Sequence, residues 1–367
     1  MTNKLFKVAI VGTGMIANAA HLPAWKHIPE DVEVVAVADA EEWRAQETAK
    51  RYNVPRAYGD WRQMLAEVKP DIVSVSTPNM YHKEVTIAAL KGGAHVLCEK
   101  PISTSYQNAI EMFQTAEAAG RYLFVNQSLR FMAPIMASKE IAASGKLGEI
   151  YYAETSSLRR RGVPKWGMFH MKVHNGGGPI YDLGVHMIDS LMWIMGNPRA
   201  VAVSAQTYLK IANKDEGLHE SLAESGAPIG VFTPRPYSYK EFDVEDFAAG
   251  FVRFENGLTL SVKSCWAANV PEGVGQTFIL GTEAGLQVFP PKLITNMGAF
   301  QVDITPKVLP DRDVAFSGHW VEVEHLMRVL RGQEGMIVKK EEVLNVMRIL
   351  DGFYKSAELG REVILED

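Results

Sequence analysis

The sharpest candidate for chemistry is a glycine-rich turn, Gly12 to Ala17 (GTGMIA), which directly follows the short apolar run Val8 to Val11. In this pattern Gly12 permits a tight turn, Gly14 lets the backbone approach a pyrophosphate, and Ala17 lets a helix pack closely on the strand. The free amides at the start of that helix then face an anion. The spacing therefore predicts a dinucleotide site whose contacts come from Gly12, Thr13, Gly14, Met15 and Ile16.

Asp39 is the candidate for binding the ribose, because it ends the second apolar run, Val32 to Ala38, roughly 20 residues beyond the turn. A carboxylate at that place accepts the ribose hydroxyls of NAD and repels the 2′-phosphate of NADP. NAD is therefore the predicted cofactor, and NADP is the less favoured one. NADP stays a second candidate, because the Arg44 guanidinium could bind that phosphate. The alternative is that Arg44 simply faces solvent on the following helix.

Polar residues also follow the later apolar runs, and in an open α/β sheet the carboxyl ends of the strands line the cofactor crevice. Ser76 to His82 follows one run. Glu99-Lys100-Pro101 follows the next, where proline turns the chain and an ammonium stands at the expected place of the nicotinamide. Asn79 could also cap the helix expected from Lys83. The predicted cofactor residues at these ends are Thr77, Pro78, Asn79, His82, Glu99, Lys100 and Asn126.

The scaffold for these residues is visible in the first third of the chain, where short apolar runs alternate with helix-length amphipathic segments. This is the pattern of parallel strands joined by crossover helices, with both faces of the sheet covered. We predict an α/β Rossmann domain with a doubly wound parallel sheet over residues 1–127. The predicted strands are Val8 to Val11, Val32 to Ala38, Ile72 to Ser76, His95 to Cys98 and Tyr122 to Val125. The predicted helices are Asn18 to Trp25, Glu41 to Tyr52, Trp61 to Glu67, Lys83 to Lys91 and Ser105 to Ala119.

The pattern changes after Gln127 to longer and more alternating strands. Asn256-Gly257, between two such strands, is a strong hairpin signal. We predict an α+β domain with a large, mainly antiparallel, open-faced sheet over residues 128–367. Its predicted helices are Ala133 to Ala143, Leu183 to Met195, Trp320 to Leu330 and Glu341 to Glu358, the last with Gly360 as its C-cap.

Composition limits the class of protein. Among 367 residues, 38 Lys and Arg stand against 43 Asp and Glu, a net charge of −5 that disfavours nucleic acid as a partner. Two cysteines cannot form a disulfide framework, and the sequence shows neither a secretory signal pattern nor an apolar run of membrane-spanning length. We therefore expect a cytoplasmic protein that does not enter membranes.

Several motifs occur in a fixed order: the Gly12 to Ala17 turn, Thr77-Pro78-Asn79 with His82, Glu99-Lys100-Pro101, and the run Gly176 to His186 (GGGPIYDLGVH). Together they resemble the Gfo/Idh/MocA oxidoreductase family, named for glucose-fructose oxidoreductase and inositol dehydrogenase. The resemblance covers nearly the whole chain, including Gly145 to Ile150, which leads into the second sheet. It implies two domains that hold the substrate between them.

The resemblance implies that Lys100 is the catalytic lysine and that Asp182 and His186 complete the catalytic set. Asp182 and His186 are also four residues apart across a helix start, so their side chains share one face. His186 is the first candidate for the proton acceptor because the ordinary pKa of histidine lies near neutrality, with Lys100 stabilising the alkoxide. The reverse assignment stays open. Asp182 would orient the substrate or the histidine.

The substrate is less well defined by sequence. Arg and Trp side chains commonly line sugar pockets, so Arg161 and Trp166, with His174, are the predicted substrate residues. The expected function is hydride transfer between NAD and a secondary hydroxyl of a cyclic polyol or sugar, such as an inositol, aldose or glycoside. Two alternatives stay open: a redox-neutral NAD-using glycosidase or epimerase of the same family, and a non-catalytic dinucleotide-binding regulator.

Three further expectations concern the rest of the chain. Ala212 to Asp243 is rich in Gly, Pro, Ser and charge and is too long for an ordinary connection, so it is a lid, an arm that contacts another subunit, or an irregular excursion. An open-faced sheet predicts a homodimer or homotetramer. No metal is expected, because His170 and His174 lack the glutamate of the zinc-protease pattern.

The assignment of Asp39 predicts a change in cofactor preference. Asp39→Ala should weaken NAD binding and narrow the gap to NADP, because the substitution removes both the ribose acceptor and the repulsion of a 2′-phosphate. Dissociation constants of both dinucleotides, measured for the variant and the unmodified protein, check this. A preference of the unmodified protein for NADP would contradict the assignment.

Overall fold

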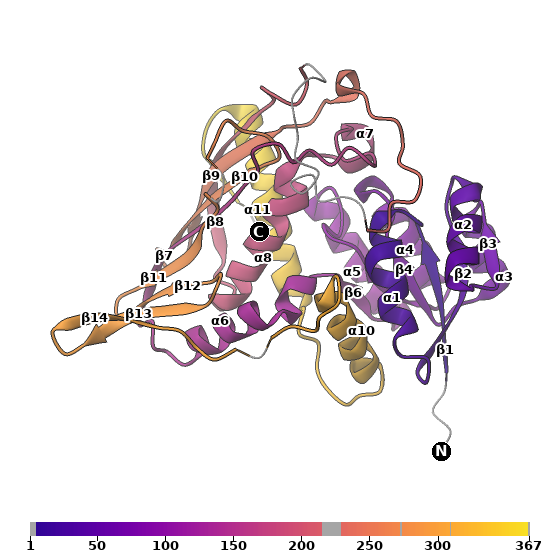
Figure 1. The fold of residues 1–367 in the computed structure, drawn as a ribbon, viewed down its shortest axis with the longest axis horizontal. Helices are drawn as coiled ribbons and strands as arrows, with labels where there is room; N and C mark the ends of the chain where they lie inside the picture. The colour runs from indigo at the N-terminus through magenta and orange to yellow at the C-terminus, as the bar shows by residue number, and fades with distance from the viewer. Residues whose placement is uncertain (1–4, 215–228, 272–273, 309, 366–367) are drawn as a thin grey trace.

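The computed structural model describes residues 5–214, 229–271, 274–308 and 310–365. Two sheets lie side by side; helices pack on both faces of the first and on one face of the second (Figure 1). The first is a six-stranded parallel sheet in the order β3-β2-β1-β4-β5-β6, as the doubly wound prediction requires. Its strands are β1 (Phe6–Val11), β2 (Val32–Ala38), β3 (Arg56–Tyr58), β4 (Ile72–Val75), β5 (His95–Cys98) and β6 (Leu123–Val125).

The predicted crossover helices of this domain are confirmed to within a few residues. Ser105, for example, accepts a hydrogen bond from the Asn108 amide to begin one of them, and Gly120 ends it in a left-handed conformation. The short strand β3 is missing from the sequence prediction because its three residues are not an apolar run. The helices are η1 (Ala17–His21), α1 (Leu22–Lys26), α2 (Glu42–Tyr52), α3 (Trp61–Val68), η2 (Asn79–Tyr81), α4 (His82–Lys91), α5 (Tyr106–Ala119) and η3 (Ser128–Phe131).

The second sheet has nine strands and is mixed, with β7 and β10 as its one parallel pair among the described residues. The hairpin predicted at Asn256-Gly257 is confirmed between β9 and β10. The strands are β7 (Ile150–Leu158), β8 (Ala200–Tyr208), β9 (Phe247–Phe254), β10 (Thr259–Cys265), β11 (Thr277–Gly281), β12 (Gly285–Gln287), β13 (Lys292–Met297), β14 (Phe300–Ile304) and β15 (Val363–Ile364).

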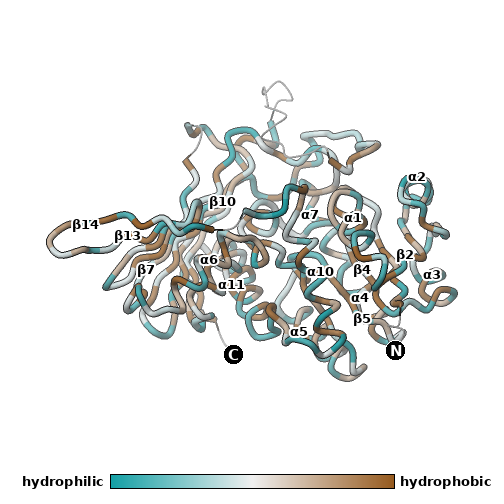
Figure 2. Tube along the Cα trace, turned by 60° about the horizontal axis from the view of Figure 1, so that its bottom comes forward, coloured by the Kyte–Doolittle hydropathy of each residue, from teal (hydrophilic) through white to brown (hydrophobic). Residues whose placement is uncertain are grey.

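Helices cover one face of this sheet (Figure 1), and the other face carries exposed apolar side chains such as Tyr151, Phe251 and Ile364. The β13–β14 hairpin projects away from the rest of the chain (Figure 2). This is the open-faced sheet that the sequence analysis expects. The remaining helices are α6 (Ala133–Ala143), α7 (Lys172–Asn175), η4 (Ile180–Gly184), α8 (Val185–Ile194), η5 (Tyr239–Glu241), α10 (Ser317–Leu330) and α11 (Lys340–Leu359).

Helix α10 lies far along the chain but packs against the first sheet. Its Val323, Leu326 and Met327 share a core with Val8 and Ile10 of β1. The division at Gln127 that the sequence predicts therefore assigns α10 to the second domain, although this helix packs on the sheet of the first. No helix among the described residues combines the length and the apolar character that a membrane crossing requires.

Candidate active site

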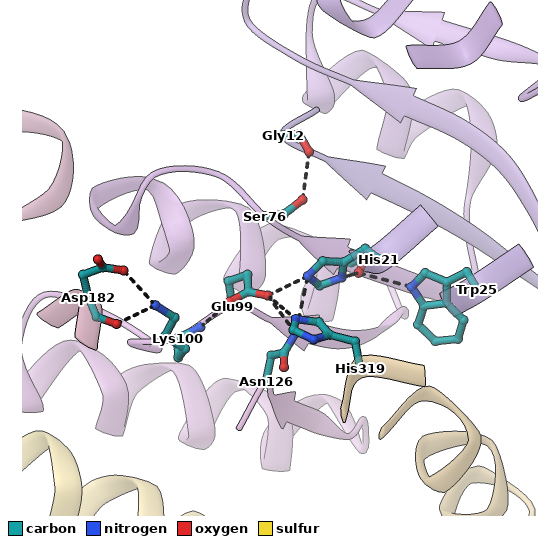
Figure 3. A network of polar contacts seen from close by, with 10 residues as sticks. Gly12, His21, Trp25, Ser76, Glu99, Lys100, Asn126, Asp182 and His319 are labelled. Carbon is teal, nitrogen blue, oxygen red and sulfur yellow. Dashed lines mark hydrogen bonds and ion pairs between the residues drawn. The ribbon is translucent and has the colours of Figure 1, made fainter. Parts of the chain in front are cut away.

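The glycine turn after β1 forms a cradle of backbone in which Gly12 and Thr13 are buried and Gly14 to Ile16 are half-buried. Gly12 has a φ of +89°, and a Cβ there would lie 2.5 Å from the Ser76 carbonyl oxygen, so the position requires glycine. The Ser76 hydroxyl donates to the Gly12 carbonyl at 2.8 Å (Figure 3). At Gly14 a Cβ would meet no atom within 4 Å. Open space beside this backbone fits a pyrophosphate against Gly12 to Ile16.

Asp39 is turned toward this cradle. One carboxylate oxygen accepts from the Thr13 amide at 2.8 Å and from the Thr13 hydroxyl at 3.0 Å, and the other accepts from the Glu41 amide at 3.0 Å. A ribose would therefore share a carboxylate that already holds the turn in place. Arg44 does not simply face solvent, because its guanidinium lies 5.1 Å from the Trp43 ring and its Nε is buried without a hydrogen-bond partner.

The predicted contacts after β4 divide into two groups. The Thr77 hydroxyl is buried without a partner, as expected of a group that awaits a ligand. Asn79 instead donates to the Asn175 carbonyl at 3.1 Å and so joins the two domains. His82 is fully buried, with its ring nitrogens 2.9 Å and 2.8 Å from the carbonyls of Pro101 and Thr77. Both ring nitrogens of His82 therefore face backbone carbonyls, and the structure shows no ring nitrogen directed at the cofactor cradle.

Lys100 and Asp182 meet across the domain boundary. The Lys100 ammonium donates to the Asp182 carbonyl at 2.9 Å and lies 3.3 Å from a carboxylate oxygen of the same residue (Figure 3). The other carboxylate oxygen accepts from the Trp266 indole at 2.9 Å. Burial by itself raises the pKa of Asp182, but Lys100, Arg159 and the Trp266 hydrogen bond together hold that pKa below its usual range. The carboxylate therefore stays ionised beside the ammonium.

His186 completes the predicted set from the first turn of α8. Burial, and then the positive charge of Lys100, lower the pKa of His186 to about 3. Its Nδ1 is buried without a hydrogen-bond partner. The imidazole is therefore neutral near neutral pH, with a free nitrogen, while its low pKa makes it a weak base. The choice between His186 and Lys100 as proton acceptor stays open.

The glycine run before Asp182 is fixed by a buried glutamate, Glu245. Glu245 accepts from the Gly178 amide at 3.0 Å and from the Tyr354 hydroxyl at 2.8 Å. A Cβ at Gly177 would lie 1.8 Å from that hydroxyl, and one at Gly178 would lie 2.2 Å from the Glu245 carbonyl. Only glycine allows this approach, which sets the start of η4 and so the position of Asp182.

The three predicted substrate residues lie in different surroundings. Arg161 donates to the Ala268 carbonyl at 3.0 Å and to the Asn269 side chain at 2.8 Å. The Trp166 indole nitrogen is buried without a partner, and His174 contacts the Tyr81 hydroxyl at 3.1 Å. Arg159, not Arg161, is the arginine that lowers the pKa of Asp182. A run of three arginines contains no signal that distinguishes them.

The described parts of the predicted lid or arm are residues 212–214 and 229–243, of which the second is here called the strap; residues 215–228 lie outside the described residues. The strap reaches the first domain (Figure 1), where the Gly230 backbone packs so tightly that a Cβ would lie 2.6 Å from the Met15 carbonyl. The Arg51 guanidinium lies 3.4 Å from the Phe232 ring centroid. At its other end Phe242 packs in a buried cluster with Trp266. The strap therefore joins the two domains beside the glycine turn.

Among the described residues, one buried cluster near Lys100 has the side-chain types of a metal site. Ligand atoms of His21, Glu99 and His319 lie within 4.8 Å of one another. However, His21 Nε2 is 2.7 Å from a Glu99 oxygen, and the Asn126 amide donates to that same oxygen at 2.7 Å. Because an amide donor points at the carboxylate where a cation would bind, the cluster is better described as a hydrogen-bonded network.

Comparison with known proteins shows the family. The oxidoreductase family model GFO_IDH_MocA, described as an NAD-binding Rossmann fold, matches residues 6–127, and the GFO/IDH/MocA C-terminal domain matches residues 135–287. The chain belongs to the Gfo/Idh/MocA family. The resemblance stated from the sequence motifs is thereby confirmed.

Two curated relatives and one solved structure are similar to this Gfo/Idh/MocA protein. It is 33% identical over 366 residues to D-glucoside 3-dehydrogenase of Escherichia coli, covering 100% of this chain and 99% of the relative. It is 23% identical to scyllo-inositol 2-dehydrogenase (NADP(+)) of Bacillus subtilis, covering 98% and 96% of the two chains. Its fold matches levoglucosan dehydrogenase in complex with NADH at a TM-score of 0.81 and 20% identity, covering 99% and 100%.

Trp266 is a positioning residue that sequence reasoning missed, because a buried tryptophan at a strand end has the pattern of ordinary core. Trp266→Phe should lower kcat by roughly 10-fold, since a hydrogen bond to a charged group is lost at Asp182. The affinity for NAD should stay within about twofold, because the glycine turn is untouched. Steady-state kinetics and isothermal titration measure both quantities. Trp320→Phe is the matched control, because its indole nitrogen has no hydrogen-bond partner; equal turnover of the two variants would contradict the role.

Proposed function

We propose that this Gfo/Idh/MocA protein is an NAD-dependent dehydrogenase that oxidises a secondary ring hydroxyl of a sugar or glycoside to a ketone. The observation that carries the proposal is the Lys100 ammonium, held by Asp182 within 3.3 Å after the end of β5, together with His186, whose pKa the Lys100 charge lowers and whose Nδ1 has no hydrogen-bond partner. An ammonium and a neutral imidazole beside a dinucleotide cradle are the groups that alcohol oxidation requires.

Relatives narrow the substrate. The full-length relative at 33% identity is a D-glucoside 3-dehydrogenase, and the B. subtilis relative acts on an inositol. Both names describe a ring that bears neighbouring secondary hydroxyls. We propose the 3-hydroxyl of a D-glucoside as the first substrate to test, with Trp166 and Arg159 as candidate pocket residues on the segment that leads to Asp182.

The proposed chemistry divides between the cofactor and this chain. When bound, the nicotinamide ring supplies the acceptor for the hydride that leaves the alcohol carbon. Lys100 binds the hydroxyl oxygen and stabilises its developing negative charge. His186 takes the hydroxyl proton in the first assignment, and Lys100 takes it in the reverse one. Asp182, held by Trp266, fixes the ammonium and so the orientation of the oxygen.

The residues that would hold the cofactor are the glycine turn, Asp39 and the unpartnered Thr77 hydroxyl. Asp39 supports NAD, while the half-buried Arg44 beside it and the NADP-dependent B. subtilis relative keep NADP as the second candidate. The homodimer or homotetramer expected from the open-faced sheet remains part of the proposal.

A substrate screen tests the function. We expect NADH absorbance to rise when the purified protein is mixed with NAD and methyl D-glucosides, and a 3-keto sugar to form in equal amount. Inositols and free aldoses serve as comparison substrates. Conversion of a glycoside without NADH accumulation would instead show the redox-neutral alternative, and no turnover with NAD bound would favour the regulator.

The reactive residues are tested by substitution. Lys100→Ala and His186→Ala should each lower kcat by at least ~10²-fold, the usual scale for a positioned proton-transfer or charge-stabilising group. NAD affinity should change far less, and the two losses should combine less than additively because the residues act as one unit. Lys91→Ala, at the exposed end of α4, is the matched control. Near-normal turnover in either active-site variant would overturn its assignment.

A further inference from the structure

Glu99 is a buried carboxylate directly before Lys100, at the end of β5. It is 6% exposed. One of its oxygens lies 2.7 Å from His21 Nε2, 2.7 Å from the Asn126 amide and 3.5 Å from His319 Nε2, and the other accepts from the Lys100 backbone at 3.2 Å (Figure 3). His21 lies on η1, Asn126 follows β6, and His319 lies on α10, where its Nε2 is in ion-pair range of Glu99 without forming a hydrogen bond. Three separate elements therefore converge on this one side chain.

The hydrogen bonds around His21 fix its role as a donor. Trp25 can only donate, and its indole nitrogen lies 3.3 Å from the Ser74 hydroxyl oxygen. Because an ionised carboxylate only accepts and a Glu99 oxygen lies 2.7 Å from His21 Nε2, that nitrogen carries a proton, while Nδ1 lies 2.6 Å from the Ser74 hydroxyl. Trp25, Ser74 and His21 thus form a series of buried polar contacts that ends with a hydrogen-bond donor to the Glu99 carboxylate.

This environment favours the ionised form of Glu99. Burial by itself raises the pKa of Glu99, but His21 and His319 together hold that pKa well below its usual range. Glu322, buried on the same helix as His319, has the opposite behaviour: burial, and then the charge of Glu99, raise its pKa well above its usual range. Glu99 is therefore ionised and Glu322 is neutral.

Glu99 directly precedes Lys100 after the end of β5, the strand end at which the nicotinamide is expected. A nicotinamide ring carries a positive charge when oxidised and none when reduced. A fixed anion in a poorly solvated site interacts with the charged form and not with the neutral one. We propose that Glu99, held ionised by His21, Asn126 and His319, is a binding determinant for the oxidation state of the cofactor, which makes the site prefer NAD⁺ over NADH.

This inference rests on the proposed function only for the placement of the nicotinamide, and it makes His21 and His319 positioning residues for Glu99. His319 had no signal in the sequence, because α10 returns to the first domain from about 220 residues farther along the chain than Glu99, and His21 had none because its partner Glu99 lies on another element. The inference goes beyond the reactive set, since none of these residues is assigned a role in proton or hydride transfer.

Binding measurements without any sugar test the proposal. Isothermal titration of Glu99→Gln should show NAD⁺ affinity reduced by at least ~10-fold and NADH affinity changed by less than about twofold. ADP-ribose, which lacks the nicotinamide, should bind the variant as it binds the unmodified protein. Glu322→Gln is the matched control, because it removes a carboxyl group that is already neutral, and its ratio of NAD⁺ to NADH affinity should not change.

A second variant guards against loss of fold. His319→Phe removes one group that keeps Glu99 ionised, and it should shift the same ratio in the same direction by a smaller factor. An equal loss of NAD⁺ and NADH affinity in Glu99→Gln, or an unchanged ratio in both variants, would overturn the proposal. Failure of the sugar screen would leave these binding ratios as they are, so the two proposals fail separately.

Discussion

The contact between the Lys100 ammonium and Asp182 is the constraint on which the rest of the site depends. It joins the end of a parallel strand in the first domain to a π-helical turn in the second, and both its oxygen acceptors belong to one residue. Burying two charges is costly unless other hydrogen bonds complete the pair. Trp266 supplies one such bond, and Arg159 adds a favourable charge. A pair maintained at this cost is more readily explained by chemistry than by stability.

The surrounding structure serves to hold that pair still. Glu245 and the glycine run set the start of η4 from one side, while Glu99 and its donors fix the strand end from the other. Asn79 joins the two domains a short distance away, and the strap connects them beside the glycine turn. Positioning of this kind is what lets an ammonium stabilise a developing charge without reorganising during the reaction. The two domains therefore act as halves of one site.

The features that the sequence predicts correctly are those that short local patterns determine. The glycine turn, the strand ends and the hairpin at Asn256-Gly257 are short patterns with few structural solutions, and the fold follows from their order. Strand β3 was not predicted because its three residues of mixed polarity show no periodic pattern of hydrophobicity. The roles of His21, Trp266 and His319 were not predicted, because each residue has the sequence pattern of ordinary core. Only the fold places it against a distant carboxylate. The role predicted for His82 was inferred from its place after a strand, which does not reveal that both ring nitrogens meet backbone carbonyls.

In the proposed mechanism Lys100 and Asp182 position an alcohol whose carbon gives a hydride to the bound cofactor. Following that hydride is the most direct measurement. The protein is mixed in excess over methyl β-D-glucoside that carries deuterium on carbon 3, with NAD present, and the cofactor is recovered for mass spectrometry. The account predicts one deuterium in the reduced cofactor and a slower single turnover than with the unlabelled sugar. Deuterium that stays in the sugar, or is found in water while NADH remains unlabelled, would contradict it.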